Sequence, residues 1–149
     1  MNKLFLALAI CLGLSACGSN DAKKDSTTNV EQTQLQETKD RVEILYFHGK
    51  QRCATCMAIE KNAKEVIEAQ FAEEIKNGTV VFKAIDISQP EIGKIVEKYE
   101  VTWSSLFISE WIDGEEVYEN LTKYAFANAR NNPDAFKNEI SSKIRTALE

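Results

Sequence analysis

Residues 42–56 read Val-Glu-Ile-Leu-Tyr-Phe-His-Gly-Lys-Gln-Arg-Cys-Ala-Thr-Cys. Residues 42–47 are rich in β-branched and aromatic side chains, as is typical of a mostly buried strand. Residues 48–52 form a polar loop, and from Ala54 onward apolar residues recur at intervals of three and four, as on one face of a helix. The stretch therefore predicts a strand that leads through a short loop into a helix, with two cysteines at the junction.

This helix runs from Ala54 to about Ile75 and is stopped by Asn77-Gly78. The pattern beyond it predicts a strand over residues 79–87, a short helix opening at Pro90, a strand over residues 106–112, its antiparallel partner over residues 115–118 after an Asp113-Gly114 turn, and a last helix starting at Asn132-Pro133. Residues 120–132 remain ambiguous. A helix between two strands gives a right-handed parallel crossover, and the hairpin adds antiparallel strands. We therefore expect an α/β fold with a mixed sheet and helices on its faces.

The core is expected to collect the apolar stripes of these elements. The large aromatic residues Tyr46, Phe47, Phe71, Phe82 and Phe107 are assigned to it. The long helix contributes Cys56, Ile59, Ala63, Val66 or Ile67, Gln70 or Phe71, and Ile75, and the last helix contributes Phe136, Ile140, Ile144 and Leu148.

The two cysteines at the junction carry the candidate chemistry. Backbone N–H groups at a helix N-terminus stabilise an anion, so the Cys53 thiolate is favoured and the pKa of its thiol is expected below the free value of about 8.5. Cys56, one turn later, falls on the buried side of the helix and suits a resolving role. Two thiols at this spacing can close a small disulfide and reopen it by exchange with a partner.

With these motifs in their order, residues 41–149 resemble the thioredoxin superfamily. The resemblance rests on the Cys53-Ala54-Thr55-Cys56 motif after a strand, the strand at residues 82–86, residues 96–101 and the closing hairpin and helix. It implies a thioredoxin-like fold, with three α/β/α layers around a central mixed sheet. It also implies protein thiols or disulfides as substrates, a membrane reductase as electron donor if the protein acts as a reductant, and no cofactor beyond the Cys53–Cys56 disulfide.

The chain departs from the thioredoxin pattern at three places. Ser105 stands where the family has a cis-proline, and we expect a trans peptide before it, because a non-proline cis bond costs about 2.5–4 kcal/mol. Tyr46 or Phe47 replaces the family's buried aspartate, which leaves its proton-shuttling role to His48 or to water. Ala-Thr between the cysteines means that the family's rules for redox potential do not transfer.

Three residues near the cysteines have open roles. Arg52 is either a solvated loop charge or a cation that stabilises the Cys53 thiolate. His48 is expected to hydrogen-bond backbone in the loop, with a proton relay or a metal ligand as alternatives. Trp103 either packs against the edge of the sheet or offers an aromatic docking surface beside the dithiol.

The first residues have the order of a bacterial lipoprotein signal. Lys3 precedes an apolar run over residues 4–14, and Leu14-Ser15-Ala16-Cys17 resembles a lipobox. We expect residues 1–16 to be a signal peptide, residues 17–40 to be the lipidated Cys17 with a flexible tether, and residues 41–149 to be the domain. The protein is then lipid-anchored in the bacterial cell envelope, facing the periplasm or the cell exterior.

Charge and composition exclude several classes of function. The formal net charge of −5 argues against nucleic acid as a partner. His48 is the chain's one histidine, which excludes sites that need two imidazoles. Three functions remain: a membrane-tethered thiol–disulfide oxidoreductase, a thiophilic metal or metalloid binder using Cys53, Cys56 and His48, and a non-catalytic adaptor that docks through Trp103 and residues 120–132.

Overall fold

The computed structural model describes residues 40–149. The predicted signal peptide, the lipidation of Cys17 and nearly all of the tether fall on residues 1–39 and so lie outside the described residues. They stay predictions.

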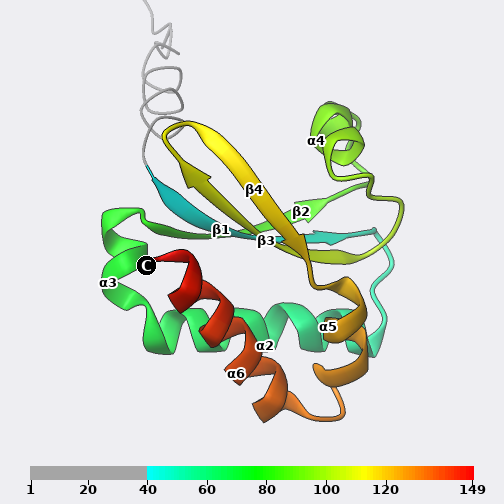
Figure 1. The fold of residues 1–149 in the computed structure, drawn as a ribbon. Helices are drawn as coiled ribbons and strands as arrows, with labels where there is room; N and C mark the ends of the chain where they lie inside the picture. The colour runs from blue at the N-terminus through cyan, green and yellow to red at the C-terminus, as the bar shows by residue number, and fades with distance from the viewer. Residues whose placement is uncertain (1–39) are drawn as a thin grey trace, which may run out of the picture.

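A four-stranded mixed sheet forms the centre of the domain (Figure 1). Its strands are β1 (Arg41–His48), β2 (Val80–Asp86), β3 (Ser105–Ile112) and β4 (Glu115–Asn120), in the spatial order β2-β1-β3-β4. β1 runs parallel to β2 and antiparallel to β3, and β3 runs antiparallel to β4. Asp113 and Gly114, which join β3 to β4, both have positive φ, at 53° and 83°. This is the backbone that a two-residue hairpin with the right-handed twist of the strands requires.

Helices cover both faces of this sheet. They are α2 (Ala54–Gln70), α3 (Ala72–Asn77), a 3-10 turn η1 (Pro90–Ile92), α4 (Gly93–Lys98), α5 (Thr122–Asn128) and α6 (Pro133–Ala147). Figure 1 shows α2, α5 and α6 on one face and α4 on the other. The expected three layers are confirmed, with one outer layer much thinner than the other. None of these helices, within residues 40–149, is long and apolar enough to cross a membrane.

β1 is buried on both faces because its side chains alternate between two cores. Val42, Ile44 and Tyr46 enter the larger core with α2, α5 and α6. Leu45 and Phe47 enter the smaller core, where Tyr99, Val101 and Phe107 pack with Ile95 and Val96 of α4. The strand therefore is a nearly continuous apolar run, which is why its sequence predicted a mostly buried strand.

The expectation of one helix from Ala54 to Ile75 is wrong. The helix breaks at Phe71, whose φ of −130° and ψ of 34° end α2 and begin α3. The break buries the Phe71 ring to 1% exposure and turns α3 out of the core, so Ile75 is 40% exposed instead of buried. Periodicity concealed the break because hydrogen bonds still run from Phe71 N to Ile67 O and from Ile75 N to Phe71 O.

Three smaller expectations also need correction or completion. The ambiguous residues 120–132 contain α5, which buries Leu121, Ala125 and Ala129 in the larger core. Leu148 ends α6 and is 38% exposed, although Phe136, Ile140 and Ile144 are buried as expected. Phe82 is half-buried and packs against the core from its edge.

A charged network lies on the α4 side of the sheet, beyond the smaller core. The Glu116 carboxylate accepts hydrogen bonds from the hydroxyls of Tyr99 and Ser109 and pairs with Lys98. Burial by itself raises the pKa of Glu116, but the bonds from Lys98, Ser109 and Tyr99 outweigh it and leave the pKa below its ordinary value of 4.5. The folded state therefore favours the ionised carboxylate.

Replacing this carboxylate tests the network. We expect Glu116→Gln to lower the free energy of unfolding at pH 7 by about 2 kcal/mol, because charge-assisted hydrogen bonds are lost. A carboxylate whose pKa is lowered on folding stabilises above its unfolded pKa, so the difference from the native chain shrinks as the pH falls below 4.5. Urea unfolding between pH 3 and 7 measures both effects, with Glu115→Gln at the exposed neighbouring position as control. A pH-independent loss contradicts the assignment.

Candidate functional site

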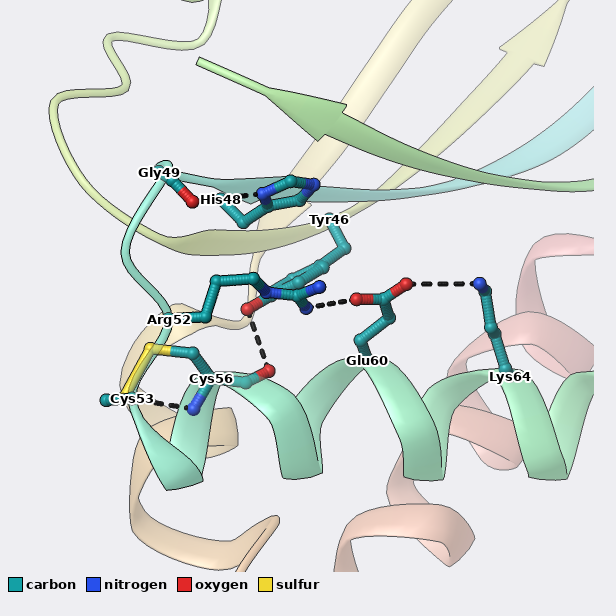
Figure 2. A network of polar contacts seen from close by, with 8 residues as sticks. All are labelled: Tyr46, His48, Gly49, Arg52, Cys53, Cys56, Glu60 and Lys64. Atoms are coloured by element: carbon teal, nitrogen blue, oxygen red, sulfur yellow. Dashed lines mark hydrogen bonds and ion pairs between the residues drawn. A yellow bond between two sulfur atoms is a disulfide. The ribbon is translucent and has the colours of Figure 1, made fainter. Parts of the chain in front are cut away.

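A disulfide joins Cys53 and Cys56, whose Cα atoms lie 5.0 Å apart (Figure 2). Cys53 is the last residue before α2 and Cys56 lies in its first turn. The strand-loop-helix order read from residues 42–56 is confirmed, and it places this cysteine pair at the point where the chain leaves the sheet and enters α2.

Cys53 is the N-cap of α2 through its own sulfur. The Cys56 N–H donates to Cys53 Sγ at 3.1 Å, and the Met57 N–H donates to the Cys53 carbonyl at 3.0 Å. The first turn of α2 contains no acidic residue. An N–H aimed at the sulfur and the positive end of the helix dipole both stabilise negative charge on Cys53. The thiolate form is therefore favoured once the disulfide is reduced.

The two cysteines differ sharply in exposure. Cys53 is exposed, whereas Cys56 is 6% exposed and belongs to the core, as expected for the buried side of the helix. A partner molecule can thus reach the Cys53 sulfur but not the Cys56 sulfur without opening the fold.

Tyr46 lies beneath the cysteine turn and connects it to the sheet. Its side chain is fully buried, and its hydroxyl donates a 2.8 Å hydrogen bond to the Cys56 carbonyl (Figure 2). Burial raises the pKa of Tyr46, although hydrogen bonds from Arg52 and Ser104 act in the opposite direction. The phenol is therefore a neutral donor. The sequence identified Tyr46 as core; nothing in its pattern indicated where the hydroxyl binds.

Arg52 pairs with a carboxylate that the sequence analysis missed. Its guanidinium bonds the Glu60 carboxylate and lies 5.6 Å from the centre of the Tyr46 ring, and Lys64 Nζ binds the other Glu60 oxygen at 3.0 Å. Figure 2 shows the Arg52 side chain pointing away from the sulfurs and toward Glu60. It is therefore neither a solvated charge nor a direct contact of the sulfur. Spacing gave one signal for Glu60, which follows Cys56 by four residues and so shares its helix face.

This ion pair keeps both groups charged. For Glu60, burial raises the pKa, but hydrogen bonds from Arg52 and Lys64 outweigh it and lower the pKa overall. For Arg52, burial lowers the pKa, but the interactions with Glu60 and Tyr46 together outweigh it and raise the pKa overall.

His48 ends β1 and does not belong to the loop as expected. Its Nδ1 donates to the Gly49 carbonyl at 3.2 Å, and its ring lies 5.9 Å from that of Tyr46. The expected backbone hydrogen bond is thus present. Among residues 40–149, no group of three or more His, Cys, Asp and Glu side chains is placed to hold a metal ion.

The Trp103–Ser105 segment leads into β3. Ser105 is buried at the start of β3 opposite Phe47, and its hydroxyl donates to the Trp103 carbonyl at 3.0 Å. Trp103 is 58% exposed and packs against Phe126 of α5, with the ring centres 5.2 Å apart.

Comparisons with solved structures give thioredoxin-like proteins. One is a thioredoxin-like protein (Trxlp) from Edwardsiella tarda, at 12% identity and a TM-score of 0.47, over 74% of this chain and 91% of that one. Thioredoxin of Fasciola hepatica is 21% identical, with a TM-score of 0.44, over 75% of this chain and 89% of that one. The zinc-bound form of human ERp44 is 20% identical, with a TM-score of 0.46, over 78% of this chain and 29% of that one. No family model and no curated protein matches the chain. The fold is thioredoxin-like, as its strand order and directions show by themselves.

The Tyr46 hydroxyl gives a direct test of the site's attachment to the sheet. We expect Tyr46→Phe to lower the free energy of unfolding by about 1 kcal/mol, because the ring is kept while one buried hydrogen bond is lost. Tyr118→Phe is the matched control, since that hydroxyl is exposed and its bond to the Lys98 carbonyl is long, at 3.4 Å. Urea unfolding measures both variants. Equal changes in the two would contradict an anchoring role for Tyr46.

Proposed function

We propose that this protein is a thiol–disulfide oxidoreductase that acts on protein disulfides or dithiols. The observation that carries the proposal is the asymmetric cysteine pair. Cys53 is exposed, caps α2 with its sulfur and is bonded to Cys56, which is buried one turn later. A structural disulfide explains this arrangement poorly, because a loop of this length removes little entropy from the unfolded chain.

In the reducing direction, the Cys53 thiolate attacks one sulfur of a substrate disulfide. A mixed disulfide forms and the first substrate thiolate leaves. The Cys56 thiolate then attacks Cys53 Sγ, which forms the Cys53–Cys56 bond and releases the second substrate thiolate. Two electrons pass from the protein to the substrate, and the two thiol protons end on the substrate sulfurs. The oxidising direction is the reverse, with a substrate dithiol as the reductant.

Membrane attachment belongs to the same proposal. The lipobox-like residues 14–17 and the polar residues 18–39 support a lipid anchor at Cys17, with the domain held near the membrane surface on the extracytoplasmic side. A membrane reductase is then the natural source of electrons if the protein works as a reductant.

Trapping of a mixed disulfide tests the exchange mechanism. With Cys56→Ser, the first exchange still occurs but the resolving thiol is absent, so a covalent adduct between Cys53 and a disulfide-bonded substrate protein accumulates. Cys53→Ser is the control and forms no such adduct, because Cys56 is buried. Non-reducing gels followed by mass spectrometry identify the adduct. Absence of an adduct in the Cys56→Ser protein counts against catalysis by exchange.

Titration of the native pair decides the direction. In thiol–disulfide buffers that contain a chelator, we expect Cys53 and Cys56 to interconvert reversibly, as read by alkylation and mass. A potential at or below about −230 mV identifies a reductant, and one of about −120 to −180 mV identifies an oxidant or isomerase. A pair that forms no reversible disulfide overturns the proposed function. Full activity in cells of the Cys53→Ser/Cys56→Ser double variant instead supports the adaptor alternative, with the exposed Trp103 as its docking residue.

A further inference from the structure

The Arg52–Glu60 pair lies next to the cysteine turn and has no part in the exchange steps described above. Arg52 directly precedes Cys53 in the chain, and Glu60 follows Cys56 by one helical turn. The side chains are largely buried, at 28% and 16% exposure. A cation and an anion are thus fixed on the face of α2 that carries Cys56 (Figure 2).

The guanidinium is held by contacts from two elements. Glu60 of α2 binds it at one end, and the Tyr46 ring of β1 lies 5.6 Å from its central carbon. Both contacts draw the side chain along α2 and away from the sulfurs, as Figure 2 shows. Arg52 is the residue directly before Cys53, so its guanidinium stays close to Cys53 when it is released from Glu60. A cation beside a thiolate lowers the pKa of the thiol.

Lys64 is a second cationic partner of Glu60. It binds Glu60 from the next turn of α2 at 3.0 Å. Replacement of Arg52 therefore leaves the Glu60 carboxylate with a cationic partner.

We propose that Glu60 is a positioning residue which holds Arg52 off the cysteine pair and thereby keeps the disulfide harder to reduce than it would be with the guanidinium beside Cys53. The inference rests on the proposed function and specifies which side chains tune it. A nearby cation stabilises a thiolate, which exists only in the reduced pair, and so favours the reduced form. The equilibrium is measured against glutathione: two glutathione molecules convert the disulfide to two thiols and form one glutathione disulfide.

The two charges are expected to affect the equilibrium between disulfide and dithiol differently. With Glu60→Gln, Arg52 is released, the pKa of the Cys53 thiol falls by about one pH unit, and the equilibrium with glutathione moves toward the dithiol by about three- to tenfold, where tenfold corresponds to ~30 mV. With Arg52→Gln, the cation is lost, and the equilibrium is unchanged or moves toward the disulfide. A purely structural pair gives the same direction for both variants.

A double-mutant cycle tests whether Glu60 acts through Arg52. In the Arg52→Gln background, Glu60→Gln should shift the equilibrium by less than twofold, because no guanidinium remains to be released. An equal shift in both backgrounds means that Glu60 acts by its own charge, which overturns the positioning role. Glu60→Ala repeats the test without an amide that can still bind Arg52.

The remaining controls separate the possible failures. Glu65→Gln, on the same helix but with Lys61 and Lys137 as its partners, should leave the thiol pKa and the glutathione equilibrium unchanged. The pKa is read from the pH dependence of alkylation of Cys53 in the reduced full chain. A native pair that never forms a reversible disulfide defeats the proposed function; a native pair that titrates normally while Glu60→Gln shifts nothing defeats only the role of Glu60.

Discussion

The hydrogen bond from the Tyr46 hydroxyl to the Cys56 carbonyl fixes the site, because it joins the central strand to the first turn of α2. α2 shares the larger core with β1 through Ile59, Ala63 and Ile67, whose apolar contacts have no preferred direction. The 2.8 Å hydrogen bond at the helix start is directional. The position of Cys56, and hence of the disulfide that Cys53 makes with it, follows from this bond.

Much of the fold was predictable because the signals that determine it are local. The apolar run of β1, the glycine and asparagine at the end of α3 and the Asp113-Gly114 turn are each read within a few residues. The break at Phe71 and the existence of α5 were not predictable in this way. α5 is defined by burial against distant elements, as the bond from Asn62 of α2 to the Ala129 carbonyl shows at 2.7 Å. No window of the sequence contains both partners of such a contact.

The candidate site was likewise predictable only where its signals are local in the sequence. The spacing of Cys53 and Cys56 and their place before a helix were visible in the sequence, and so was the burial of Cys56. The partners of Arg52 and Tyr46 were not visible, because a polar atom at the end of a long side chain is paired only when strands and helices meet. The sequence predicted Arg52 to be either a solvated loop charge or a cation that stabilises the Cys53 thiolate, and the structure pairs it with Glu60.

Tyr46, one of the two residues expected in place of the family's buried aspartate, bonds the cysteine turn through its hydroxyl. Burial raises the pKa of Tyr46 and keeps its phenol neutral. Arg52 and Glu60 place a pair of opposite charges beside the turn, and each stabilises the other in ionised form. Because opposite charges largely cancel at a distance, the effect of this pair on Cys53 depends on where the guanidinium lies relative to Glu60. The redox tuning that we propose therefore acts through the position of the Arg52 side chain.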